Sequence, residues 1–126
     1  MKRSTLATLV LGAVATAMVA PFAIADDEEK AKPKHSIKEV MKVALKGGLQ
    51  KKVLAGEATD DEKKELLDMY VSLVESKPPK GEMNSWHNLA GGAALAAAKV
   101  VVGREGALDE LKAATNCKAC HSQHKP

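Results

Sequence analysis

Aromatic residues are almost missing from this sequence, whose 126 residues include one Phe, one Tyr and one Trp. Phe22 lies near the N-terminus, so Tyr70 and Trp86 are the only aromatics in the rest of the chain. Alanine dominates the other apolar positions but buries little surface, and a small domain is seldom stable on such a core alone. We therefore expect a covalent link or a bound group to supplement the core.

A strong excess of charge of one sign is also missing. The net charge is +3 at pH 7, and removal of Lys2 and Arg3 would leave 17 basic against 16 acidic residues. Nucleic-acid-binding domains carry a pronounced basic patch, so the mixed charges argue against nucleic acid as a partner. The sequence also lacks a Ser–His–carboxylate grouping and a phosphate-binding glycine loop, which argues against an enzyme.

The first 25 residues have the pattern of a signal peptide. Lys2 and Arg3 precede an apolar run from Leu6 to Ala20, and Ala23-Ile24-Ala25 provides the small residues that signal peptidase accepts. The run is shorter than the roughly 20 residues of a membrane-spanning helix, and Pro21 follows it. We expect cleavage after Ala25, no stable membrane insertion afterwards, and a periplasmic product whose cysteines meet an oxidising environment.

No segment shows the alternating pattern of a half-buried strand, and apolar residues instead recur at helical spacing. Residues 26–35 are charged and are predicted to be a flexible lead-in. Residues 36–126 predict one domain, an all-α antiparallel four-helix bundle.

Capping signals predict where the helices begin and end. Capping boxes at Ser36 and Thr59 begin the first two helices, and the Gly47-Gly48 pair should bend or interrupt the first before residues 49–56 continue it. The second helix ends at the prolines that follow residue 77. Asn84 or Ser85 should cap the third, which stops near residue 103, and the fourth should run from residues 105–108 through the two cysteines, as far as residue 124.

The two cysteines lie close to the C-terminus, in Cys117-Lys118-Ala119-Cys120-His121. Cys-x-x-Cys-His is the signature of covalent haem attachment. On a helix, Cys117, Cys120 and His121 leave one face within a single turn. Two thiols can then bond to the two vinyl groups of one porphyrin while the imidazole reaches the iron from the same side. The motif predicts one covalently attached haem c.

Three alternatives remain for the same cysteines. A redox dithiol of the thioredoxin kind should lie at a helix start after a strand, whereas this motif is expected near the end of a helical chain. A zinc site would need a second close ligand pair, which His35, His87 and His124 do not offer. A structural disulfide would close a loop of only four residues and would constrain the unfolded chain weakly.

The C-terminal sequence CKACHSQHK, with Lys125 four residues after the haem histidine and ALDELKAATN before it, resembles the cytochrome c′ family. The resemblance is specific at residues 117–125 and architectural over residues 36–103. It implies a periplasmic four-helix bundle that holds the haem between its first and fourth helices. One difference is His124, because the family commonly has an aromatic residue before the basic one.

The resemblance also raises the question of the sixth iron ligand. Low-spin members have a methionine on the first helix and carry electrons, whereas members with an apolar side chain there are five-coordinate and bind small gases. Met41 lies on the apolar stripe of the first helix, at the corresponding place, although such a methionine is commonly core filler. Met69, Met83 and the histidines His35, His87 and His124 are weaker candidates, and His124 shares a helix with His121.

These features predict an exported monohaem c-type cytochrome with His121 and Met41 as axial ligands, which carries single electrons between periplasmic proteins. The alternatives are a five-coordinate haem protein that binds small gases such as NO or CO, and a non-haem structural bundle with an incidental disulfide. Lys118 and Lys125 are expected either to pair with haem propionates, to guide an anionic partner or simply to solubilise the surface. A homodimer is compatible with the resemblance.

Overall fold

The computed structural model describes residues 32–126; the predicted signal peptide and residues 26–31 of the predicted lead-in lie outside the described residues. The described part is all-helical and contains no strand, as the sequence predicts. Its elements are α1 (Ile37–Val40), the π-helix η1 (Met41–Lys46), α2 (Leu49–Leu54), α3 (Asp60–Glu75), α4 (Met83–Val101), α5 (Ala107–Ala114) and α6 (Cys117–His124).

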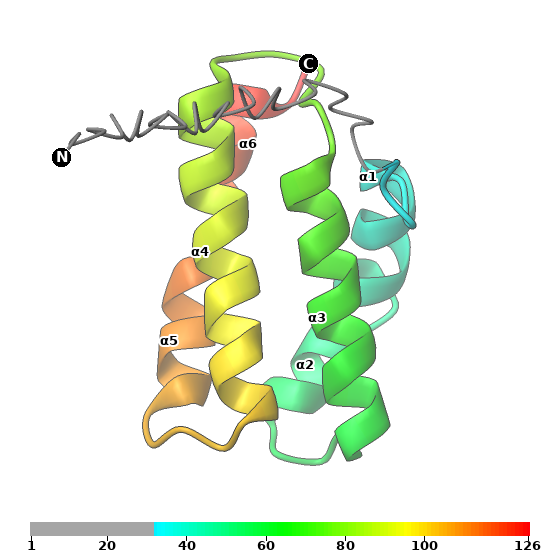
Figure 1. Ribbon diagram of the computed structural model, residues 1–126, viewed down its shortest axis with the longest axis vertical. Coiled ribbons are helices and arrows are strands. Elements are labelled where there is room, and N and C mark those ends of the chain that lie inside the picture. The colour runs from blue at the N-terminus through cyan, green and yellow to red at the C-terminus, as the bar shows by residue number, and fades with distance from the viewer. Residues whose placement is uncertain (1–31) are drawn as a thin grey trace, which may run out of the picture.

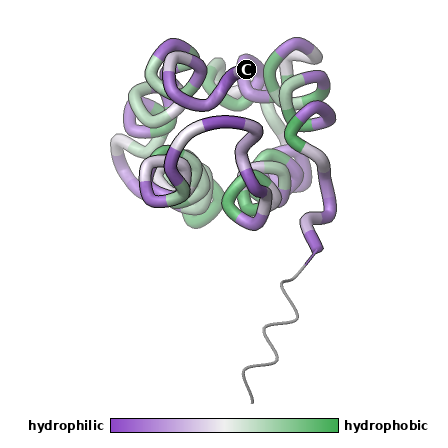
Figure 2. Tube along the Cα trace, turned by 90° about the horizontal axis from the view of Figure 1, so that it is seen from above, coloured by the Kyte–Doolittle hydropathy of each residue, from purple (hydrophilic) through white to green (hydrophobic). Residues whose placement is uncertain are grey.

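These elements form four roughly antiparallel columns (Figure 1). The first column combines α1, η1 and α2, the second and third are α3 and α4, and the fourth combines α5 and α6. Contacts between α2 and α5 bring the first column beside the fourth, while α3 packs against both the first column and α4. Seen from above in Figure 2, the columns surround a common centre. The arrangement is compatible with the predicted helical bundle.

The caps explain where the predicted boundaries hold and where they do not. The Thr59 box is complete, because the Glu62 amide donates to Thr59 Oγ1 and the Thr59 amide donates to the Glu62 carboxylate. At Ser36 only half of the box forms: Ser36 Oγ accepts from the Glu39 amide at 3.1 Å, while the Glu39 side chain accepts from His35 instead. The expected caps of α4 were wrong, because this helix begins at Met83 after Glu82.

The predicted interruption at Gly47-Gly48 is confirmed. Gly48 has a φ of +85°, a left-handed conformation that favours glycine. A Cβ on Gly47 would lie 2.6 Å from the carbonyl oxygen of Val43, so the end of η1 has no room for a side chain. The glycine pair thus ends the π-helix and lets α2 start in a new direction.

Alanine forms much of the core, as the composition predicts. Six of the fifteen buried apolar residues are alanines: Ala44, Ala90, Ala93, Ala96, Ala97 and Ala107. The bulkiest buried side chains are Tyr70, Leu66, Leu111 and Trp86, and the Trp86 indole N–H donates to the Leu73 carbonyl at 2.8 Å. This bond joins the start of α4 to the end of α3, at the end of the bundle where the cysteine motif lies.

Candidate functional site

Helix α6 carries the cysteine motif and has its own start. Asn116 caps it, since its Oδ1 accepts from the amides of Lys118 at 3.1 Å and Ala119 at 3.3 Å. Cys117 is therefore the first residue of the helix. Cys117, Cys120 and His121 all border the same cleft, which fits the expectation that they share a face.

The sequence did not predict the break between α5 and α6. Thr115 ends α5, because its hydroxyl donates to the Leu111 carbonyl at 2.6 Å and accepts from the side-chain amide of Gln50 at 2.9 Å. Gln50 lies on α2, so a contact between distant segments stops the helix. One consequence concerns the dithiol alternative: Cys117 does lie at a helix start, contrary to the premise on which that alternative was set aside.

Both cysteines are free thiols in this structure, Cys117 exposed and Cys120 half-buried. Burial, and to a lesser extent the neighbouring Cys117, raises the pKa of the Cys120 thiol above its ordinary value. Burial likewise raises the pKa of Tyr70, which is 2% exposed, so the phenol stays protonated at neutral pH. The Tyr70 hydroxyl donates to the side-chain carbonyl of Gln50.

The cleft bordered by the motif has a volume of about 510 Å³, within the usual range for cofactor and ligand sites. Its lining is mostly apolar and comes from α1, η1, α4, α6 and the segments beside them: Ile37, Met41, Leu45, Lys46, Pro79, Trp86, Cys117, Cys120, His121, His124, Lys125 and Pro126. A deeper cavity of about 60 Å³ shares six of these residues and is also lined by Tyr70, Leu89, Ala90 and Ala93. The motif thus faces an apolar space that the protein's own side chains leave unfilled.

Met41 borders both the cleft and the deeper cavity. Of the methionines in residues 32–126, Met69 is buried in the core and Met83 is half-buried, and neither lines these spaces. Met41 is also the first residue of η1, and π-helical turns occur frequently at functional sites. The structure therefore brings Met41 to the same space as the cysteine motif and leaves the other two candidates away from it.

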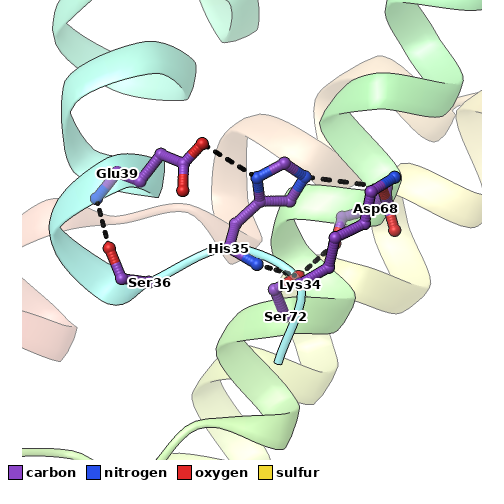
Figure 3. Close-up of polar contacts among 6 residues, drawn as sticks. All are labelled: Lys34, His35, Ser36, Glu39, Asp68 and Ser72. Atoms are coloured by element: carbon purple, nitrogen blue, oxygen red, sulfur yellow. Dashed lines mark hydrogen bonds and ion pairs between the residues drawn. The ribbon is translucent and has the colours of Figure 1, made fainter. Parts of the chain in front are cut away.

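Two of the remaining histidines lie away from the cleft. His87 is exposed on α4. Figure 3 shows the His35 ring between two carboxylates, with Nδ1 3.1 Å from Glu39 and Nε2 3.5 Å from Asp68. Lys34 also pairs with Asp68, and the His35 amide donates to Ser72. The last two residues of the predicted lead-in are thus held against α3, and His35 has partners outside the site.

His124 is the residue whose role the sequence missed. It is 2% exposed, and its ring lies edge-on to Trp86 with centroids 5.3 Å apart. Nδ1 lies 2.9 Å from the Lys80 carbonyl, which can only accept, so Nδ1 carries the proton. Nε2 lies 3.1 Å from the Ser85 hydroxyl, whose proton is donated to the Gln123 side-chain carbonyl. His124 therefore packs against Trp86 and fixes α6 to the loop before α4. The sequence signal was its place one residue before Lys125, where the cytochrome c′ family, which the C-terminal sequence resembles, commonly has an aromatic residue.

The glycines of α4 do not contribute to the cleft. A Cβ on Gly91 or Gly92 would meet no neighbouring side chain or distant backbone atom within 4 Å. Ala90 and Ala93 are the small residues of α4 that line the cavity. The glycines instead lie on a less covered face of the helix.

Comparison with protein-family models, curated proteins and solved structures found no match for this chain. In the part of the chain that the structure describes, no helix has the length and apolar character needed to cross a membrane. Within residues 32–126, no three His, Cys, Asp or Glu side chains gather as ligands for a bare metal ion.

Proposed function

We propose that the chain is an exported monohaem c-type cytochrome, a four-helix bundle that carries single electrons between periplasmic proteins. The observation that carries the proposal is the shared cleft: two free thiols, an imidazole and a thioether border one apolar space. Cys117 and Cys120 would hold the porphyrin through thioether bonds, and His121 and Met41 would supply the axial ligands. The bound haem would supply one-electron redox chemistry.

The residues around the cleft fit this group. Cys117 and Cys120 are not joined in a disulfide in the structure, so both sulfurs are placed to bond to vinyl groups. The mostly apolar lining would favour a thioether ligand from Met41 over water, and Trp86, held by its bond to Leu73, would lie against the bound group. His124 orients α6 and with it the imidazole of His121, since the Nδ1 bond to Lys80 fixes one end of the helix.

Two measurements test the proposal. The protein is co-expressed with haem-attachment enzymes and run on a denaturing gel stained for haem; absence of covalent haem would refute it. Absorption spectra of the ferrous protein then compare wild type with Met41→Ala. We expect a low-spin wild type and a high-spin variant, because the variant loses one axial ligand.

Met83→Ala is the matched control, because Met83 is a half-buried methionine that does not line the cleft. It should keep the low-spin spectrum. A wild type that is already high-spin and binds carbon monoxide would instead support the gas-binding alternative.

A second candidate function follows from the position of Cys117. A thiol at the first turn of a capped helix interacts with the positive end of the helix dipole, as in dithiol oxidoreductases. In that case Cys117 and Cys120 would form a reversible disulfide, and the protein would exchange it with substrate thiols. The haem-stained gel separates the two candidates, because thioether bonds consume both thiols.

A further inference from the structure

The two lysines that line the cleft stand out from its apolar surroundings. Lys46 is the last residue of η1 and Lys125 is the first residue after α6, so the two lysines reach the cleft from different columns. No aspartate or glutamate lines the cleft. Both lysines are exposed, and neither forms an ion pair with any residue from 32 to 126. The cleft therefore offers an apolar interior with two unpaired cations at its margin.

Such a site suits a ligand with an apolar body and two negative groups. A carboxylate placed against the apolar lining would lose its hydration, whereas one at the margin stays solvated and gains a cation. Two carboxylates on one edge of a flat ligand could meet Lys46 and Lys125 while the rest of the ligand enters the cleft. A purely basic docking surface for a protein would not require the lysines to line the cleft itself.

We infer that Lys46 and Lys125 bind the two carboxylates of a porphyrin dicarboxylic acid and so orient it with its carboxylate edge at the mouth of the cleft. This inference rests on the proposed function and names the side chains that orient the cofactor before attachment. Lys118, which the sequence offered as a propionate partner, is exposed on α6 and does not line the cleft. Lys46 takes its place.

The test uses the full chain without haem, its thiols kept reduced, and a metal-free porphyrin dicarboxylic acid that lacks vinyl groups and cannot form thioethers. Trp86 is the sole tryptophan and lines the cleft, so quenching of its fluorescence reports binding. Each exposed lysine–carboxylate pair contributes up to about 1 kcal/mol, which predicts a roughly two- to fivefold weaker Kd for Lys46→Gln and for Lys125→Gln. The double variant should lose roughly the product of the two factors.

Two controls make the result specific. The dimethyl ester of the same porphyrin has no charge to pair, so its Kd should be equal for wild type and variants. Lys42 and Lys118 lie on the same two columns, do not line the cleft and form no ion pair with any residue from 32 to 126. Lys42→Gln and Lys118→Gln should therefore leave the Kd of the diacid unchanged.

Three outcomes would overturn the inference: no binding of the diacid to wild type, equal loss of affinity for diacid and ester, or an effect of the control lysines as large as that of the lining lysines. The last outcome would point to a diffuse basic surface for an anionic partner protein. Because the assay needs neither iron nor attachment, its failure leaves the haem-stained gel as a separate test of the proposed function.

Discussion

The partly buried chain of hydrogen bonds from Tyr70 through Gln50 to Thr115, where α5 ends, offers the sharpest test of how the site is held. Tyr70 on α3 donates to Gln50 on α2, and Gln50 donates to Thr115 at 2.9 Å, one residue before the cap of α6. Tyr70→Phe keeps the ring and removes the donor, leaving the Gln50 carbonyl without its partner. An unpaired buried polar group costs about 1–3 kcal/mol, and the half-buried Gln50 favours the lower end of that range.

We therefore expect Tyr70→Phe to lower the free energy of unfolding by about 1 kcal/mol and Tm by about 4–8 °C, for a domain of this size. Urea unfolding followed by far-ultraviolet circular dichroism measures the first quantity. Ser122→Ala is the control, because the exposed Ser122 hydroxyl bonds only within α6, and it should stay within about 0.5 kcal/mol of wild type.

A double-mutant cycle separates the bond from general packing. Gln50→Leu alone leaves the Tyr70 hydroxyl without its acceptor. The double variant, Gln50→Leu with Tyr70→Phe, removes both the donor and the acceptor, so no polar group of this hydrogen bond is left without a partner. The double variant should be less destabilised than the sum of the single variants, by about 0.5–1 kcal/mol. Additive losses, or a Tyr70→Phe protein as stable as wild type, would refute the idea that this chain holds the break between α5 and α6.

Two further predictions concern stability. Gly91→Ala and Gly92→Ala should each stabilise the protein by about 0.5–1 kcal/mol, because alanine is the better helix former and its Cβ would contact no neighbouring atom. Gly81→Ala should instead destabilise the protein, because the φ of Gly81 is +88° and the new Cβ would lie 2.7 Å from the Gln123 carbonyl oxygen. Thermal unfolding measures both effects, and a loss of stability in the Gly91 and Gly92 variants would contradict the open surroundings of these residues on α4. The hydrogen bond from Lys34 holds the pKa of Asp68 below its ordinary value, so the stability that Asp68 contributes is present above about pH 3.9 and is lost as the pH falls through the lowered pKa. The difference in free energy of unfolding between wild type and Asp68→Asn should therefore become smaller below about pH 3.9. A difference that stays constant from pH 7 to pH 2 in urea unfolding would contradict this.

Features that depend on neighbouring residues were predictable from the sequence. The Thr59 capping box, the Gly47-Gly48 interruption and the all-helical class follow from local propensities. The spacing of the cysteine motif is equally local, so its residues can be named from the sequence alone.

Features that depend on distant partners were not predictable in the same way. Ser85 was expected to cap α4, but its hydroxyl instead bonds to Gln123 and His124, 38 and 39 residues away. The end of α5 depends on Gln50, 65 residues from Thr115. Polar side chains choose between local and tertiary partners, and the sequence shows only the local ones.

The small side chains that replace bulky ones in this sequence occupy two regions of the structure. Where α3 and α4 pack, Ala96 and Ala97 are buried with Leu66 nearby in the same core cluster, and the small residues allow close packing there. Nearer the middle of α4, Ala90 and Ala93 line the cavity beside the cysteine motif. The same residue type therefore has two effects: close helix packing in one region and an apolar cavity wall in the other. The proposed haem, a flat and largely apolar group, would fit against such a wall, so the composition and the motif support the same proposal.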